Sequence, residues 1–139
     1  MPVELSDLMQ LALGQRPHLW VGDLPRHVAE IMGCHPAAVY LGSKTMRHIA
    51  EKHPEMRREE FQMMPYLLKS GSYYLESNRP RSVTVLGQLG HDYKRYMVGL
   101  KSAENGCEVW VETMFRTGQR KGLRKIKGCR LIYGQPITE

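Results

Sequence analysis

The sequence predicts an α+β fold, with N-terminal helices packed on an antiparallel sheet of about four strands. Up to Gly71 the apolar residues recur at the three- and four-residue spacing of amphipathic helices. After Gly71 apolar and polar residues alternate, which is the period of strands. The alternating runs follow one another too closely for parallel crossovers, so hairpins are expected. The length of 139 residues suits a single domain, and we expect residues 1–139 to form one.

The first half of the chain carries the start and stop signals of short helices. Residues 3–14 place leucines and a methionine on one stripe and end at Gly14. Residues 23–33 begin with Asp23, a residue type that favours helix N-caps, and end at a glycine. We also expect a short strand at 38–42 and helices at 43–53, 57–64 and 65–70.

Four alternating runs in the second half are typical of strands. They cover residues 72–77, 81–88, 93–102 and 107–115. The intervening segments SNRP, LGHD and ENG contain residues that favour tight turns. The segment LRKIKG then predicts a basic turn or a short helix, and RLIYG predicts a last strand.

All of the excess positive charge lies in the C-terminal third. Residues 1–92 contain ten Lys or Arg and ten Asp or Glu, whereas residues 93–139 contain ten and four, which gives the net charge of +6. Residues 116–130 alone carry seven positive side chains and no negative one. A polyanion partner is one interpretation, because fixed cations displace condensed counterions from phosphates. A solvated surface segment is the other.

The cysteines indicate a reducing compartment. Cys34, Cys107 and Cys129 show no CxxC spacing, and their odd number argues against a disulfide scaffold. We therefore expect a cytoplasmic protein, with neither a metal nor a cofactor. No apolar run reaches membrane length, so no membrane partner is expected.

The segment MRHIAEKHPE, residues 46–55, concentrates proton-handling side chains at the end of an expected helix. The stripe expected to face the core consists of Met46, Ile49, Ala50 and His53. His48 and Lys52 fall on an adjacent face. One alternative makes His53 a buried histidine satisfied by a backbone carbonyl, and His48 and Lys52 a solvated face. Zinc binding fits poorly, because the spacing is not that of HExxH.

The strand expected at 107–115 ends in polar residues. Its alternation places Thr113 on the same face as Val109 and Val111, at the polar end of an otherwise apolar row. Arg116 follows as the strand ends. Threonine is a common strand residue, so Thr113 also suits ordinary sheet packing.

Several of these segments together resemble a ribonuclease superfamily. The motifs TMRHIAEKHPE, YMVGLK and VETMFRT, followed by a basic segment, are similar to phage-borne members of the barnase/EndoU/colicin D/RelE-like nucleases. The resemblance covers residues 38–133 and leaves residues 1–37 as a helical N-terminal extension. It implies a barnase- or RelE-like fold and a catalytic Lys–His pair with a strand hydroxyl, here Lys52, His53 and Thr113.

The resemblance also implies a biological setting. Such a protein would be a toxin- or effector-like product of a phage or prophage. It would act in the cytoplasm of the bacterial host, or of a target cell after delivery. Its protein partners would be an immunity protein or a phage structural protein.

The expected chemistry is metal-independent cleavage of RNA, with tRNA or rRNA as the substrate. The ribose 2′-OH attacks the neighbouring phosphate and leaves a 2′,3′-cyclic phosphate. His53 would be the general base or acid, because histidine titrates near neutral pH. His48 would be a second proton carrier or a phosphate contact. Lys52, Thr113 and Arg116 would stabilise charge on the phosphorane.

The basic segment is expected to hold the RNA backbone. The side chains proposed for this are Arg120, Lys121, Arg124, Lys125 and Lys127. Tyr93, Tyr96 and Trp110 would stack on bases, although aromatic residues are also common in ordinary sheet packing. The alternative function is a non-catalytic module of the same fold that binds RNA or a protein, with His53 in the core.

Overall fold

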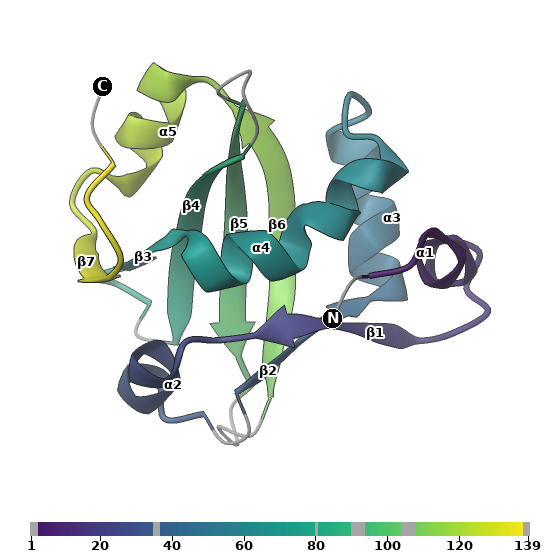
Figure 1. Ribbon diagram of the computed structural model, residues 1–139, viewed down its shortest axis with the longest axis horizontal. Coiled ribbons are helices and arrows are strands. Elements are labelled where there is room, and N and C mark those ends of the chain that lie inside the picture. Colours follow the sequence, from purple (N-terminus) through teal and green to yellow (C-terminus); the bar gives the residue numbers. More distant parts are fainter. Residues whose placement is uncertain (1–2, 35–36, 80, 90–93, 104–107, 138–139) are drawn as a thin grey trace.

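The computed structural model describes residues 3–34, 37–79, 81–89, 94–103 and 108–137, without the side chains of residues 89, 94, 119 and 120. Within these residues the chain forms one mixed sheet of seven strands with helices around it (Figure 1). The strands are β1 (His18–Asp23), β2 (Ala38–Gly42), β3 (Ser72–Leu75), β4 (Ser82–Leu89), β5 (Lys94–Ser102), β6 (Val109–Thr117) and β7 (Arg130–Tyr133). The helices are α1 (Leu5–Ala12), α2 (Arg26–Met32), α3 (Ser43–Lys52), η1 (Arg58–Met63), α4 (Met64–Ser70) and α5 (Gln119–Ile126). No helix in these ranges is both long and apolar enough to span a membrane.

The α+β class is confirmed, but the sheet is larger than predicted. Its order is β1-β2-β6-β5-β4-β3-β7, and the four strands expected from the alternation form its antiparallel centre. β7 extends this centre at one edge, as the last strand predicted from RLIYG. β2 joins it at the other edge as a parallel neighbour of β6.

The segment expected as a purely helical extension also contains a strand. β1 pairs antiparallel with β2, and its register shifts between Trp20 and Gly22. Gly22 has φ 151°, so this irregularity falls at a residue without a side chain. The bulge shortens the alternation to a few residues, which hides the strand from a search for period two.

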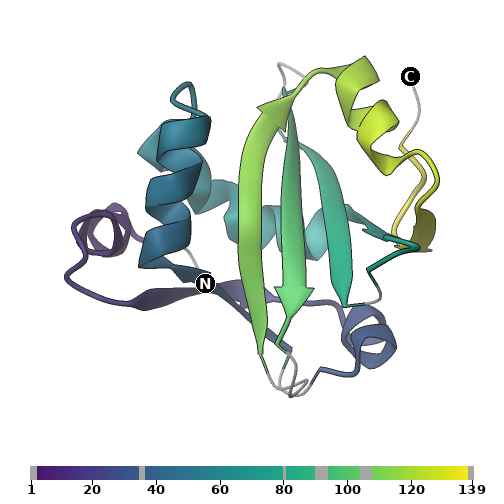
Figure 2. The ribbon, with the colours of Figure 1, turned by 180° about the vertical axis from the view of Figure 1, so that it is seen from behind.

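Helices cover the two faces of the sheet unequally. α4 lies across one face (Figure 1), where the larger hydrophobic core joins the sheet to α1, α2, α3 and α4. α5 packs on one end of the opposite face through Leu123 and Ile126. Seen from behind, β4, β5 and β6 are otherwise open to view (Figure 2). We call this second side the open face of the sheet.

Ser43 links two helices instead of capping one. It is the first residue of α3, and its hydroxyl donates a hydrogen bond of 2.7 Å to the carbonyl of Leu11 in α1. The N-cap of α3 is Gly42, so Ser43 lies inside the first turn of the helix. The N-terminal helix is thereby fixed beside α3, the helix that precedes His53.

Tyr73 anchors the end of α4 to the sheet. Its side chain is fully buried, and its hydroxyl donates a 2.6 Å hydrogen bond to the carbonyl of Leu68. That carbonyl belongs to the last turn of α4, where carbonyls lack partners within the helix. Burial, with a smaller contribution from Tyr133, raises the pKa of Tyr73 far above its usual value.

Tyr73→Phe should lower the free energy of unfolding by about 1–3 kcal/mol, because a buried helix carbonyl loses its donor. The raised pKa also predicts a pH effect. The neutral hydroxyl stabilises the fold fully below the unfolded pKa of 10.0, and this contribution is lost as the pH rises above it. Unfolding in urea, measured between pH 7 and 11, should therefore show a steeper loss of stability above pH 10 in the wild type than in the variant.

Tyr66→Phe is the matched control, because Tyr66 lies on α4 with 63% of its surface exposed. It should leave stability within about 0.5 kcal/mol of the wild type. Equal stability of the Tyr73→Phe and Tyr66→Phe variants would contradict the anchoring role of the Tyr73 hydroxyl.

Candidate active site

His53 sits at the end of α3, where the helix meets β6. Its backbone N–H bonds to the carbonyl of Ile49 at 2.8 Å, and Pro54 follows. Its imidazole stacks on the ring of Phe115, with ring centroids 4.7 Å apart and planes at 21°. Nδ1 lies 3.6 Å from a carboxylate oxygen of Glu55. The side chain is half-buried and its Nδ1 faces a carboxylate, so His53 is not the buried histidine of the alternative interpretation.

The stripe expected to carry His53 into the core is only partly correct. Met46 and Ile49 are buried, whereas Ala50 is exposed and 21% of the His53 side chain is exposed. The helix ends before His53, whose φ of −128° and ψ of 69° turn it off the helical stripe. This turn takes the imidazole to Phe115, outside the main core.

A buried ionic network holds the segment that follows His53. Glu60 in η1 is 7% exposed and accepts a 2.8 Å hydrogen bond from the hydroxyl of Tyr96. Arg116 Nε lies 2.9 Å from the same carboxylate as an ion pair, although its N–H does not point at the oxygen as in a hydrogen bond. Nη2 of Arg116 donates at 2.6 Å to the carbonyl of Glu55. Arg116 therefore fastens the loop beside His53 to β6.

Thr113 faces the open side of the sheet, and not the side expected. The β5–β6 register shifts at Gly99 and Leu100, whose partners are Thr113 and Val111. The extra residue is a β-bulge, and it reverses the alternation of β6. Thr113 consequently shares a face with Phe115, while Val111 points into the core.

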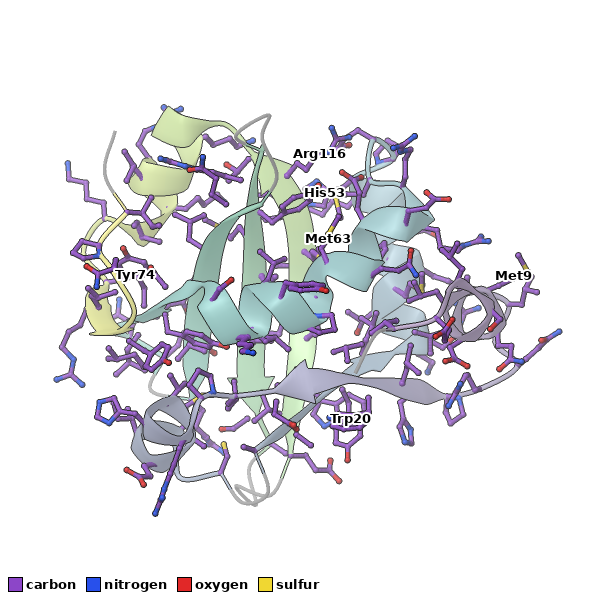
Figure 3. All side chains as sticks on the ribbon, viewed as in Figure 1. Met9, Trp20, His53, Met63, Tyr74 and Arg116 are labelled. Carbon is purple, nitrogen blue, oxygen red and sulfur yellow. The ribbon has the colours of Figure 1, made fainter. Side chains whose placement is uncertain are left out.

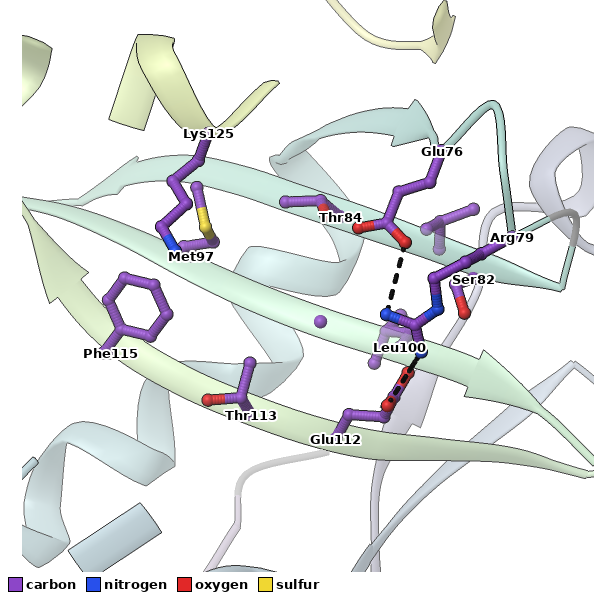
Figure 4. A pocket seen from close by; sticks show the side chains of 12 residues that line it. Glu76, Arg79, Ser82, Thr84, Met97, Leu100, Glu112, Thr113, Phe115 and Lys125 are labelled. Carbon is purple, nitrogen blue, oxygen red and sulfur yellow. Dashed lines mark hydrogen bonds and ion pairs between the residues drawn. The ribbon is translucent and has the colours of Figure 1, made fainter. Parts of the chain in front are cut away.

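Thr113 lines a small hollow on the open face (Figure 4). The hollow has a volume of about 170 Å³, and Phe115, Met97 and Lys125 border one end of it. At the other end, Arg79 bridges the carboxylates of Glu76 and Glu112. His53 adjoins this hollow through Phe115, which its ring covers.

His48 and Lys52 are exposed on α3. Their spacing of four residues puts them on one side of the helix, so they form a polar face of the helix that precedes His53. This arrangement agrees with both interpretations of the pair, a solvated face and a contact for phosphate. Their roles in catalysis stay predictions.

Part of the basic segment forms α5. Of the segment LRKIKG, residues 123–126 are the end of this helix and residues 127 and 128 form the turn that follows it. The apolar side of α5 packs Leu123 and Ile126 on the sheet. Lys121, Arg124, Lys125 and Lys127 are exposed, and Lys125 also reaches the hollow beside Phe115 (Figure 4). The side chain of Arg120 lies outside the described part of the chain.

The three aromatic residues proposed for base stacking differ in position. Tyr96 is 4% exposed and bonded to Glu60, so it is not a stacking surface. Tyr93 lies outside the described residues. Trp110 is partly exposed on the open face and is the one of the three whose described position suits a ligand.

Three residues of this site had no sequence signal as functional groups. Glu55, Glu60 and Phe115 position His53 and Arg116, yet each looks ordinary in the sequence. Glu60 stands in a run of charged residues that resembles a solvated surface, and Phe115 resembles a sheet-packing residue. Contacts between distant segments give these residues their roles.

Neither a metal centre nor a known relative accounts for the site. Among the described residues no three His, Cys, Asp or Glu side chains gather to hold a metal ion. No family model, curated protein or solved structure matches the chain.

Glu60→Gln should lower the free energy of unfolding by about 2 kcal/mol, because it leaves Arg116 beside a neutral partner. The loss should be smaller than for a fully buried pair, since 32% of the Arg116 side chain is exposed. Chemical unfolding monitored by circular dichroism measures it.

Glu59→Gln is the control for this change, because Glu59 is exposed and next to Glu60 in the same turn. Its effect should stay below about 0.5 kcal/mol, as for a surface charge near a helix start. If both variants unfold at the same denaturant concentration, the network does not hold the loop beside His53.

Proposed function

We propose that the chain is a metal-independent endoribonuclease that cleaves RNA by attack of a ribose 2′-OH on the adjacent phosphate. The observation that most supports this is the placement of His53. Its imidazole is held between the ring of Phe115 and the carboxylate of Glu55, at the edge of an open sheet face that carries a basic helix. A positioned, partly exposed imidazole is the group that proton transfer at neutral pH requires.

Each neighbouring residue has a distinct role in this proposal. His53 takes the proton from the 2′-OH or gives one to the departing 5′-oxygen. Glu55, near Nδ1, orients the ring so that Nε2 meets the substrate. Lys52 and the hydroxyl of Thr113 stabilise negative charge on the phosphorane, and His48 supplies a second proton or contacts phosphate.

Arg116 has a different role from a freely exposed phosphate ligand. Its guanidinium already binds Glu60 and the carbonyl of Glu55. We therefore assign it first to positioning, because it fixes the loop that carries Glu55 beside His53. Contact of Arg116 with the phosphorane remains a prediction that requires one of these partners to give way.

The charge of α5 supplies the affinity for RNA. Lys121, Arg124 and Lys125 are exposed on a helix that lies on the same sheet face as Phe115. Backbone phosphates on this helix would direct an RNA strand toward His53. The proposal includes tRNA or rRNA as the substrate. It also includes a phage or prophage origin and a toxin-like role with an immunity partner, because the resemblance of residues 38–133 implies both.

His53→Gln should slow RNA cleavage by about 100-fold or more, because general acid–base catalysis contributes that much. The affinity for RNA should change little, since the imidazole acts on the proton and not on the backbone. The rate is measured on denaturing gels with tRNA or rRNA in EDTA, and the thermal midpoint of each variant is measured alongside.

His27→Gln is the control, because His27 is exposed on α2, away from α3. It should cleave at the wild-type rate. A folded His53→Gln variant that cleaves as fast as His27→Gln would remove His53 from the mechanism. If the wild type binds RNA but cuts none, the non-catalytic RNA-binding module is the function.

The double variant Lys121→Glu, Arg124→Glu should weaken binding to RNA of any sequence. It should also flatten the plot of log affinity against log salt by about 0.7 for each phosphate of a single strand that the helix no longer neutralises. Filter binding or fluorescence anisotropy across a salt series measures both effects.

The variant Arg26→Glu, Lys69→Glu changes the net charge equally, at exposed positions on α2 and α4. It should keep the wild-type slope and most of the affinity. If the slope of log affinity against log salt is the same in both double variants, RNA binding depends only on the total charge, and α5 is not the binding surface.

A further inference from the structure

The open face of the sheet carries a row of aromatic side chains. Trp20 on β1 is the register partner of Tyr40 on β2, and Tyr40 is the partner of Trp110 on β6. Register partners share a face of the sheet, so the three side chains cross three strands in one line. Figure 3 labels Trp20 at the end of the molecule opposite to His53.

Contacts at their edges hold these rings. Nε1 of Trp110 donates to the carboxylate of Glu108 at 3.0 Å, and Nε1 of Trp20 donates to a backbone carbonyl at 2.9 Å. The ring centroids of Tyr40 and Trp110 are 5.5 Å apart, and His18 packs edge-on against both rings. Because the indole N–H groups of both tryptophans are engaged, a ligand on this row would use the faces of the indole rings.

Next to Trp110, the open face carries the cationic side chain of Lys101 and a hollow that both residues line. Lys101 on β5 is the register partner of Trp110, and it is exposed. Among the described residues its side chain makes no ion pair or hydrogen bond. Lys101 and Trp110 line a hollow of about 470 Å³ together with Thr45 and Glu112. Arg79 already binds both carboxylate oxygens of Glu112 at 3.1 Å, so Lys101 is the cation placed to meet an anion.

We infer that this hollow binds one nucleotide of a single-stranded RNA, with the base stacked on Trp110 and the phosphate on Lys101. Side chains of cross-strand partners lie about 5 Å apart at their bases, which is the scale of a single nucleotide. A ring that stacks and a cation that holds the backbone are the two elements of single-strand recognition.

The open face joins this hollow to the proposed catalytic site. Trp110 and Phe115 both lie on β6, roughly 16 Å apart at about 3.3 Å per residue. The bulge between them lets both side chains face the open side. An RNA strand bound at Trp110 would thus run along β6 to His53. RNA as the ligand class rests on the proposed function, to which the hollow adds a base-binding site.

Charge favours RNA over a proline-rich peptide, the other ligand class that docks on aromatic rows. The whole excess of +6 lies in residues 93–139, the region that supplies both Lys101 and Trp110. A phosphate on Lys101 uses that charge, whereas a proline-rich peptide supplies no anion for it. Titration with such a peptide therefore belongs in the test.

Tryptophan fluorescence tests the row directly, because Trp20 and Trp110 are the chain's two tryptophans. In Trp20→Phe the remaining emission comes from Trp110. A short single-stranded 2′-O-methyl RNA should quench that emission saturably, and a proline-rich peptide should not. The probe has no free 2′-OH, so binding is measured without cleavage.

Substitutions then assign the two halves of the site. Trp110→Leu should weaken binding of the same probe by about 10-fold or more, because the base no longer stacks on an aromatic ring. Lys101→Gln should lower the salt slope by about 0.7, because one phosphate is no longer neutralised. The controls Tyr66→Leu and Lys69→Gln change exposed residues on α4, across the sheet, and should leave affinity and slope unchanged.

The outcomes separate this inference from the proposed function. Quenching and the expected effects of both substitutions, in a protein that cleaves no unmodified RNA, support the nucleotide site and overturn the nuclease. Wild-type affinity in a folded Trp110→Leu variant, or quenching by the peptide alone, overturns the nucleotide site. If Trp110→Leu does not fold, an unchanged salt slope in Lys101→Gln overturns it.

Discussion

The β-bulge in β6 is the constraint on which the candidate site depends. Before the bulge, Val109 and Val111 point into the core; after it, Met114 does. The reversal turns Arg116 inward to Glu60 and Phe115 outward to His53. With regular alternation, every side chain of β6 after Glu112 would face the opposite side, and neither pair would meet. One extra residue therefore sets the position of the imidazole.

One face of the sheet contains most of the stabilising core, and the other carries the features proposed for RNA recognition. The helix-covered face contains the larger hydrophobic core, the Tyr73 anchor and the buried carboxylate of Glu60. The open face carries α5 at one end and the aromatic row at the other, with the Thr113 hollow between them. Outside the residues packed under α5, substitutions of exposed side chains on the open face should therefore change binding more than folding, which makes them the better choice for functional tests.

The sequence was sufficient for local structure and insufficient for pairings between distant segments. Helical period and alternation predicted the helices of the first half and the four central strands, because these depend on neighbouring residues. β1 was not predicted, because the irregularity at Gly22 breaks its alternation of apolar and polar residues. The direction of Thr113 was wrong because threonine and its neighbours give no signal of a bulge. The Glu60–Arg116 contact joins residues far apart in sequence, and the residues around each of them do not predict it.

The chemistry of the RNA ends tests the central claim most directly. Wild-type protein is incubated with tRNA and rRNA in EDTA, and the termini of any fragments are identified by mass spectrometry. Attack by the 2′-OH predicts fragments with a 2′,3′-cyclic phosphate at one end and a 5′-hydroxyl at the other. Intact RNA, or fragments with 5′-phosphates that form only when a metal ion is added, would contradict a metal-independent nuclease centred on His53.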